Sequence, residues 1–201
     1  MTVNKLYPHT IGCSENMFLK GKKVLLRSIE KEDIEIIRNG INNPDMERTI
    51  VGYAYPISRK DQEKWFDSYS PSDRMLRFII ETEEDGVVGL TGLRDINWKN
   101  GTAENAGIRI FNKELHGRGL ATDAQFTLYR YAFEELRLNR ISGKILEGNK
   151  ASLRMDEKLG FKIEGIQRQA VFKNGVFHDV YLMGLLKSDY EQIVRELKYW
   201  D

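Results

Sequence analysis

The chain has 201 residues, with 31 Lys and Arg against 30 Asp and Glu, so its formal net charge is only +1. This length suits one sizeable domain, and a hydrophobic content of 41% is typical of a packed globule rather than of a disordered chain. The even charge argues against a general nucleic-acid binder, which needs a basic excess. The single cysteine, Cys13, excludes an internal disulfide, and no His and Cys cluster has metal-ligand spacing, so we expect no metal site. No apolar run is long enough for a membrane span or a secretory signal, which predicts a cytoplasmic protein that needs no membrane.

The first third of the chain predicts one short strand and two helices. Residues 1–17 mix turn-forming residues without a hydrophobic period, which indicates an irregular extension. The run 24–26 predicts a strand, and isoleucines at helical spacing over 34–41 predict a helix that Gly40 and Pro44 end. Ser58 with an acidic residue three positions later is a capping pattern, and it predicts a short amphipathic helix that ends by Pro71.

The middle of the chain predicts an antiparallel meander followed by a long helix. The runs 76–81 and 87–93 flank an acidic loop and read as a hairpin. A third strand is expected at 108–111, after the turn Asn100-Gly101. The period then becomes helical over 119–136, with apolar residues on more than one side, so we expect this helix to be deeply buried.

The last third predicts a strand, a helix, a hairpin and a terminal helix. A strand at 140–146 precedes a helix at 150–159, for which Asn149 is a suitable N-cap and Gly160 a left-handed stop. Asn174-Gly175 between two apolar runs is the strongest local hairpin signal in the chain. Residues 187–201 read as a charged helix.

The segment from His116 to Ala124 joins a strand to the long helix and is suited to holding an anion. Gly117 and Gly119 let the backbone turn tightly, so that consecutive N–H groups point outward beside the positive end of the helix dipole. Phosphate groups match such a cradle, and Arg118 could add a charged contact at its rim. The alternative is an ordinary glycine-containing loop before a core helix.

In its residues this segment resembles motif A of the GNAT acetyltransferases, whose pattern is Gln/Arg-x-x-Gly-x-Gly/Ala. Gly119 and Ala121 match, whereas His116 stands where the family has Gln, Arg or an aromatic residue. The run Asn149-Lys150-Ala151-Ser152, followed by Lys158-Leu159-Gly160-Phe161, is similar to a segment of the RimJ/RimL-like branch, which acetylates ribosomal-protein N-termini, polyamines or other small amines. The residues at 173–180 are similar to the final hairpin of that branch.

The resemblance implies a fold and an activity. The fold is α+β, with a central, mostly antiparallel, splayed mixed sheet of about seven strands flanked by helices over residues 18–186; the extension 1–17 and the helix 187–201 lie outside it. The activity is that of an N-acetyltransferase, in which the primary amine of a small molecule or peptide attacks acetyl-CoA directly in a ternary complex. The family often forms dimers, so a homodimer is compatible with it. The residues implied in acetyl-CoA binding are the strand Ile108, Arg109 and Ile110, the turn Gly117, Arg118, Gly119, Leu120, Ala121 and Thr122, and Asn149.

Acetyl transfer needs a neutral amine, a polarised carbonyl and a proton for the departing thiolate. Many relatives carry Tyr at the position of Asp156, so the usual Tyr acid is missing. Ser152, together with Asn149, is our replacement candidate, although a serine here can also simply bond the helix end. Asp156 is a candidate general base or a hook for a cationic substrate, and Glu104 is a candidate to orient the amine or take its proton. For both carboxylates the ordinary expectation is solvation.

Two alternatives remain at this stage. The missing Tyr and the unusual His116 also suit a GNAT-like module that binds acyl-CoA or a partner protein with little turnover. A nucleotide-binding protein is the weaker choice, because the strands before the glycines look antiparallel. The aromatic residues at 65, 66 and 69 either line the acceptor pocket or form a buried helix stripe, and His178 reads as structural because a strand places it and Asp179 on opposite faces.

Overall fold

The computed structural model describes residues 18–52, 55–69 and 74–201. The expected irregular extension with Cys13, and Pro71, lie outside the described residues. The described strands are β1 Phe18–Lys20, β2 Leu25–Arg27, β3 Met75–Thr82, β4 Gly86–Asn97, β5 Thr102–Asn105, β6 Arg109–Ile110, β7 Arg140–Leu146, β8 Lys162–Lys173 and β9 Val176–Leu186. The described helices are α1 Ile34–Ile41, α2 Pro44–Glu47, α3 Arg59–Ser68, α4 Leu120–Arg130, α5 Lys150–Lys158 and α6 Lys187–Leu197.

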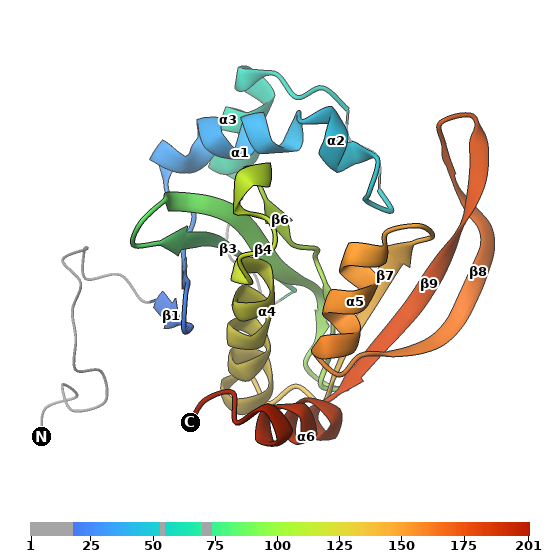
Figure 1. Cartoon of the computed structure of the whole chain (residues 1–201). Coiled ribbons are helices and arrows are strands. Elements are labelled where there is room, and N and C mark those ends of the chain that lie inside the picture. The colour runs from blue at the N-terminus through green and yellow to red at the C-terminus, as the bar shows by residue number, and fades with distance from the viewer. Residues whose placement is uncertain (1–17, 53–54, 70–73) are drawn as a thin grey trace, which may run out of the picture.

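The nine described strands form one mixed sheet in the order β1-β2-β3-β4-β5-β7-β9-β8, with β6 also paired to β4 (Figure 1). The α+β fold is therefore confirmed, with more strands than the expected seven. All pairings are antiparallel except that of β5 with β7. The strand expected at 108–111 is the short strand β6, which pairs with Gly89 and Leu90 near the start of β4. A further strand that was not predicted, β5, pairs with the end of β4. Since β7 pairs with β5 and not with β6, the sheet splays between β6 and β7.

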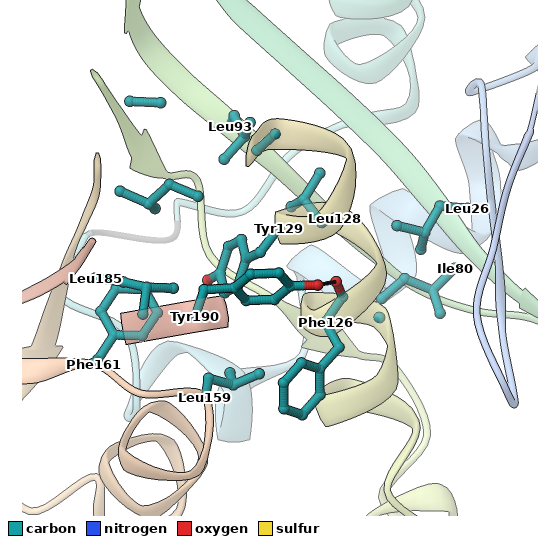
Figure 2. Close-up of a cluster of buried hydrophobic side chains, with 14 of the residues drawn as sticks. Leu26, Ile80, Leu93, Phe126, Leu128, Tyr129, Leu159, Phe161, Leu185 and Tyr190 are labelled. Atoms are coloured by element: carbon teal, nitrogen blue, oxygen red, sulfur yellow. Dashed lines mark hydrogen bonds between the residues drawn. The ribbon is translucent and has the colours of Figure 1, made fainter. Parts of the chain in front are cut away.

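The main core lies between the sheet and α4, as Figure 2 shows. The prediction of a deeply buried helix is confirmed, because Phe126, Leu128 and Tyr129 of α4 are almost inaccessible to solvent. The helix does not continue regularly to residue 136, since Tyr131–Glu135 form a π-helical turn. Tyr190 of α6 donates a hydrogen bond to the carbonyl of Phe126 at 3.2 Å, so the terminal helix packs on α4 as part of this core.

A smaller core covers the opposite face of the sheet under α1 and α3. Ile37 packs with Ile79 and Leu90 of the sheet, and the aromatic residues of α3, Trp65 and Phe66, pack against this cluster. Ser58 accepts a hydrogen bond from the N–H of Asp61 at 3.1 Å, which confirms the predicted cap of α3. The two layers of helices therefore sandwich the N-terminal half of the sheet (Figure 1).

The elements of the C-terminal half agree closely with those predicted from the sequence. Asn149 accepts a hydrogen bond from the N–H of Ser152 at 3.1 Å and so caps α5, and Gly160 has a φ of +94° after its end. Asn174 and Gly175 both have positive φ, which makes the tight turn of the long β8–β9 hairpin. The terminal helix α6 ends at Leu197 rather than at residue 201. Among the helices of the described residues, none is long and apolar enough to cross a bilayer.

Candidate active site

The turn that leads into α4 forms an open cradle of backbone N–H groups. Gly117 and Gly119 have φ values of +81° and +83°, which only glycine adopts without strain. Gly119 is the N-cap of α4 and no side chain caps the first turn, so the N–H groups of Leu120 to Thr122 point toward the turn. In the described part of the chain, a Cβ on Gly117 would meet no atom within 4 Å. These features fit a pyrophosphate held at a helix N-terminus.

The cation beside this cradle is not the one expected. The guanidinium of Arg118 forms ion pairs with Glu84 at 2.9 Å and Asp85 at 3.0 Å, both in the β3–β4 loop, so it is turned toward carboxylates. The ammonium of Lys23 instead donates to the carbonyl of Arg118 at 2.8 Å and lies 3.2 Å from the position of a Cβ on Gly119. The acidic loop thus holds Arg118, and Lys23 is the ammonium at the cradle.

The short strand β6 presents backbone groups to the splayed gap. The N–H of Phe111 donates to the carbonyl of Val88 at 2.8 Å, toward β4. Because alternate residues of an antiparallel strand point their N–H groups in opposite directions, the N–H and carbonyl of Ile110 point away from β4. The ring of His116 contacts that carbonyl, with Nε2 at 3.2 Å from the oxygen. The N–H of Ile110 is therefore available to an oxygen in the gap.

A cavity of about 350 Å³ opens where the sheet splays. It collects the candidates Glu104, Ile108, Arg109, Asn149, Ser152 and Asp156 from three separate parts of the chain. Ile110 and the turn Gly117 to Thr122 do not line it; they follow β6 along the chain toward α4. The other lining residues are Thr49, Ile50, Val51, Gly52, Arg94, Asn105, Ala106, Gly107, Gly143, Lys144, Ile145 and Met155.

Asp156 is buried at the α5 side of the cavity, which corrects the expectation of a solvated carboxylate. Its exposed fraction is 5%, and one carboxylate oxygen would lie 3.8 Å from a Cβ on Gly143 of β7. Burial raises the pKa of Asp156 to about 7, because a charged carboxylate is poorly solvated there. The neighbouring hydroxyl of Tyr129 accepts a hydrogen bond from Asn105 at 2.7 Å, and burial, followed by the charge of Asp156, raises the pKa of Tyr129. Asp156 can therefore carry a proton near neutral pH.

Asn149 and Ser152 sit at the first turn of α5. The amide oxygen of Asn149 caps the helix, and its amide nitrogen donates to the carbonyl of Thr49 at 2.9 Å. Asn149 thereby joins α5 to the segment 49–52, which lines the cavity. Ser152 also lines the cavity, and helical spacing places Ser152 and Asp156 on the same side of α5.

Glu104 is paired rather than solvated. It lies opposite Arg94 in the β4–β5 register and forms an ion pair with it. The nearby Asp95 is exposed and does not line the cavity. The aromatic residues of α3 also stay outside the lining, in the small core, and His178 contacts the carbonyl of Lys173 at 3.2 Å, away from the cavity.

Several side chains at the site were missed by the sequence interpretation. Lys23 and Arg94 give no local motif, since Lys23 reaches the cradle through the contact of its N–H with Asp123, and Arg94 lies at the cavity through the pairing of β4 with β5. For Lys144 a weak signal existed, because it alternates with the apolar residues of a predicted strand and so had to face away from the main core.

An anion cradle at a helix N-terminus, a strand with outward backbone groups, and a cavity with a protonatable carboxyl together define an acyl-CoA-dependent acyltransferase. The chain matches the family model "Acetyltransferase (GNAT) domain" over residues 23–162. It belongs to the GNAT acetyltransferase family.

Similar proteins agree with this assignment. The chain is 31% identical to the probable N-acetyltransferase YjcK of Bacillus subtilis, over 87% of this chain and 99% of that protein. It is 37% identical to the putative ribosomal N-acetyltransferase YdaF of the same organism, over 54% and 58%. The crystal structure of spermidine N-acetyltransferase from Vibrio cholerae in complex with CoA and spermine superimposes with a TM-score of 0.77, at 27% identity over 84% of this chain and 98% of that chain. Ribosomal and polyamine acetyltransferases are the relatives that the sequence resemblance implied.

Proposed function

We propose that this enzyme transfers the acetyl group of acetyl-CoA to a primary amine by direct attack, with Asp156 as the general acid. The observation that carries the proposal is the position of Asp156: a buried carboxyl with a pKa near 7 at the α5 side of the gap between β6 and β7. This is the position where many relatives carry Tyr. The role of general acid replaces that of base or cation hook, because a carboxyl with a pKa of about 7 keeps its proton near neutral pH, can donate it, and carries no charge while protonated.

The first turn of α4 and the strand β6 supply the groups that bind acetyl-CoA in this proposal. The N–H groups of Leu120, Ala121 and Thr122 bind the pyrophosphate, with Lys23 adding a charged contact. The backbone of Ile108 to Ile110 pairs with the pantetheine, and the N–H of Ile110 polarises the acetyl carbonyl. Acetyl-CoA supplies the activated acyl group.

Two carboxyls on opposite sides of the gap divide the proton transfers. The amine nitrogen forms a bond to the acetyl carbon, the carbon–sulfur bond breaks, and protonated Asp156 gives its proton to the sulfur. Glu104, held by Arg94, orients the amine and accepts its proton through water. Ser152 lies one helical turn before Asp156 at the cavity, and Asn149 keeps α5 and residues 49–52 in place.

A thiol-release assay with acetyl-CoA and a panel of amines tests the activity. Product formation above the rate of hydrolysis supports an enzyme. If acetyl-CoA raises the Tm of the protein but no amine is acetylated, the result would favour the binding module instead. If millimolar acetyl-CoA does not raise the Tm, the result would contradict both the enzyme and the acyl-CoA-binding module.

A further inference from the structure

Three arginines from three neighbouring strands lie on one face of the sheet beside the cavity. Arg77 of β3 pairs with Gly92 of β4, and Arg109 of β6 pairs with Leu90. Residues 90, 92 and 94 of β4 share one face because strand residues alternate, so Arg77, Arg94 and Arg109 all face the side covered by α1 and α3.

This face carries an excess of positive charge at the gap. Lys144 lines the cavity and shares the face, since the register places Ser142, two residues earlier, opposite Glu104. Among the residues that line the cavity, Glu104 is the carboxylate of this face, and it is already paired with Arg94. Over residues 18–52, 55–69 and 74–201, Arg77 and Arg109 form no ion pair with a carboxylate. Asp156 lies on the opposite face of the sheet, next to Gly143 of β7.

Burying these arginines close to one another is electrostatically unfavourable. Burial, and then the charge of Arg77, lowers the pKa of Arg109, while burial and the charge of Arg94 lower the pKa of Arg77. The Nε atoms of Arg77 and Arg94 are buried and find no hydrogen-bond partner among the described residues. An anion on this face would relieve the repulsion and supply acceptors, and a guanidinium binds carboxylate and phosphate with two parallel hydrogen bonds.

We infer that the acceptor is a small primary amine that also carries a carboxylate or phosphate group, with the anion held by Arg109 beside Arg77 and the amine directed to Glu104. This inference rests on the proposed function and deepens it. A polyamine, which is cationic along its length, would be repelled by the same row. The acceptor class therefore differs from that named for the similar spermidine acetyltransferases.

Pairs of acceptors that differ only in the anion test the inference. We would compare β-alanine with β-alaninamide, O-phosphoethanolamine with ethanolamine, and both pairs with spermidine, at fixed acetyl-CoA. At least one anionic acceptor should exceed its neutral partner by about 10-fold or more in kcat/KM, as expected when a charged hydrogen bond is gained. β-Alaninamide has the less basic amine, so a preference for β-alanine cannot arise from amine protonation. The two pairs separate carboxylate from phosphate recognition.

Side-chain variants test the same point. Arg109→Met should raise KM for the preferred anionic acceptor by about 10- to 100-fold with kcat little changed, while acetyl-CoA still raises Tm. Arg109→Lys should recover part of the loss. Arg168→Met, at an exposed arginine on β8, is the matched control and should behave as the parent. Turnover that favours the neutral amines or spermidine, or an Arg109→Met enzyme with unchanged KM, would overturn the inference and leave the acetyltransferase activity standing; no turnover with any amine would end both.

Discussion

The carboxylate of Asp123 on α4 accepts a hydrogen bond from the backbone N–H of Lys23 at 2.6 Å. The same carboxylate accepts the N–H groups of Lys22 and Val24 and the hydroxyl of Tyr199, and its residue is 1% exposed. One buried side chain thus fastens the turn between β1 and β2, and the C-terminal segment, to the helix whose first turn forms the cradle. This contact places the ammonium of Lys23 beside the candidate pyrophosphate site.

Replacing Asp123 by Asn should weaken both the fold and acetyl-CoA binding. An amide lacks the charge and one of the acceptor oxygens, so buried N–H groups lose their partner and the free energy of unfolding should fall by about 2–4 kcal/mol. Urea unfolding, with and without acetyl-CoA, measures both effects. Asp67→Asn, on the exposed side of α3, is the control. An Asp123→Asn protein that unfolds at the parent urea concentration would refute the clamp.

Gly119→Glu should abolish the rise in Tm that acetyl-CoA causes. The new side chain would project toward Lys23 and put a carboxylate where the phosphates are proposed to bind. Gly175→Glu is the matched control, because Gly175 has the same φ of +83° and open space around it, so it tests backbone strain alone. Differential scanning fluorimetry with millimolar acetyl-CoA is the measurement. Equal shifts in the two variants would contradict the cradle.

Asp156→Asn should lower kcat by about 100-fold or more, the usual contribution of a general acid. The parent enzyme needs protonated Asp156, so its kcat should decline as the pH rises through about 7. The variant should lose this limb of the pH profile while KM for acetyl-CoA stays close to the parent value. A variant with parental kcat, or an unchanged pH limb, would remove Asp156 from the reaction.

The same substitution should make the protein more stable above neutral pH. The pKa of Asp156 is raised from 3.8 to about 7 on folding, so the folded state keeps a proton that the unfolded state releases, and stability falls as the pH rises between these values. At pH 8 the Asn variant should gain about 1–4 kcal/mol over the parent, and at pH 4 the two should be nearly equal. Urea unfolding at both pH values checks this, and a variant less stable at pH 8 would contradict it.

Asn149→Ser should separate the two contacts of Asn149. A serine keeps the N-cap of α5 but cannot reach the carbonyl of Thr49, so stability should change little while KM for the acceptor rises by about 3- to 10-fold, the value of one hydrogen bond. Asn149→Ala should lose the cap as well and about 1 kcal/mol of stability. Steady-state kinetics and thermal unfolding of both variants measure this, and an Asn149→Ser enzyme with the parental KM for the acceptor would argue against a role for the contact with Thr49.

Most local features of this fold could be predicted because they depend on neighbouring residues. Asn149 as a cap, Gly160 as a stop and Asn174-Gly175 as a turn need only side-chain chemistry and φ preferences within a few positions. The separate strand β5 could not be predicted in this way, because it forms by pairing with the end of β4 on one side and with β7 on the other.

The sequence by itself determined the α+β class, the glycine turn before α4 and the kinship with acetyltransferases, since each is a matter of pattern along the chain. Only the tertiary structure decided that Asp156 is buried, that Arg118 turns to the acidic loop and that Lys23 replaces it at the cradle. The physical reason is that desolvation and ion pairing depend on groups far apart in the chain. Lys23 and Asp123 are 100 positions apart in the sequence, and only folding brings them into contact.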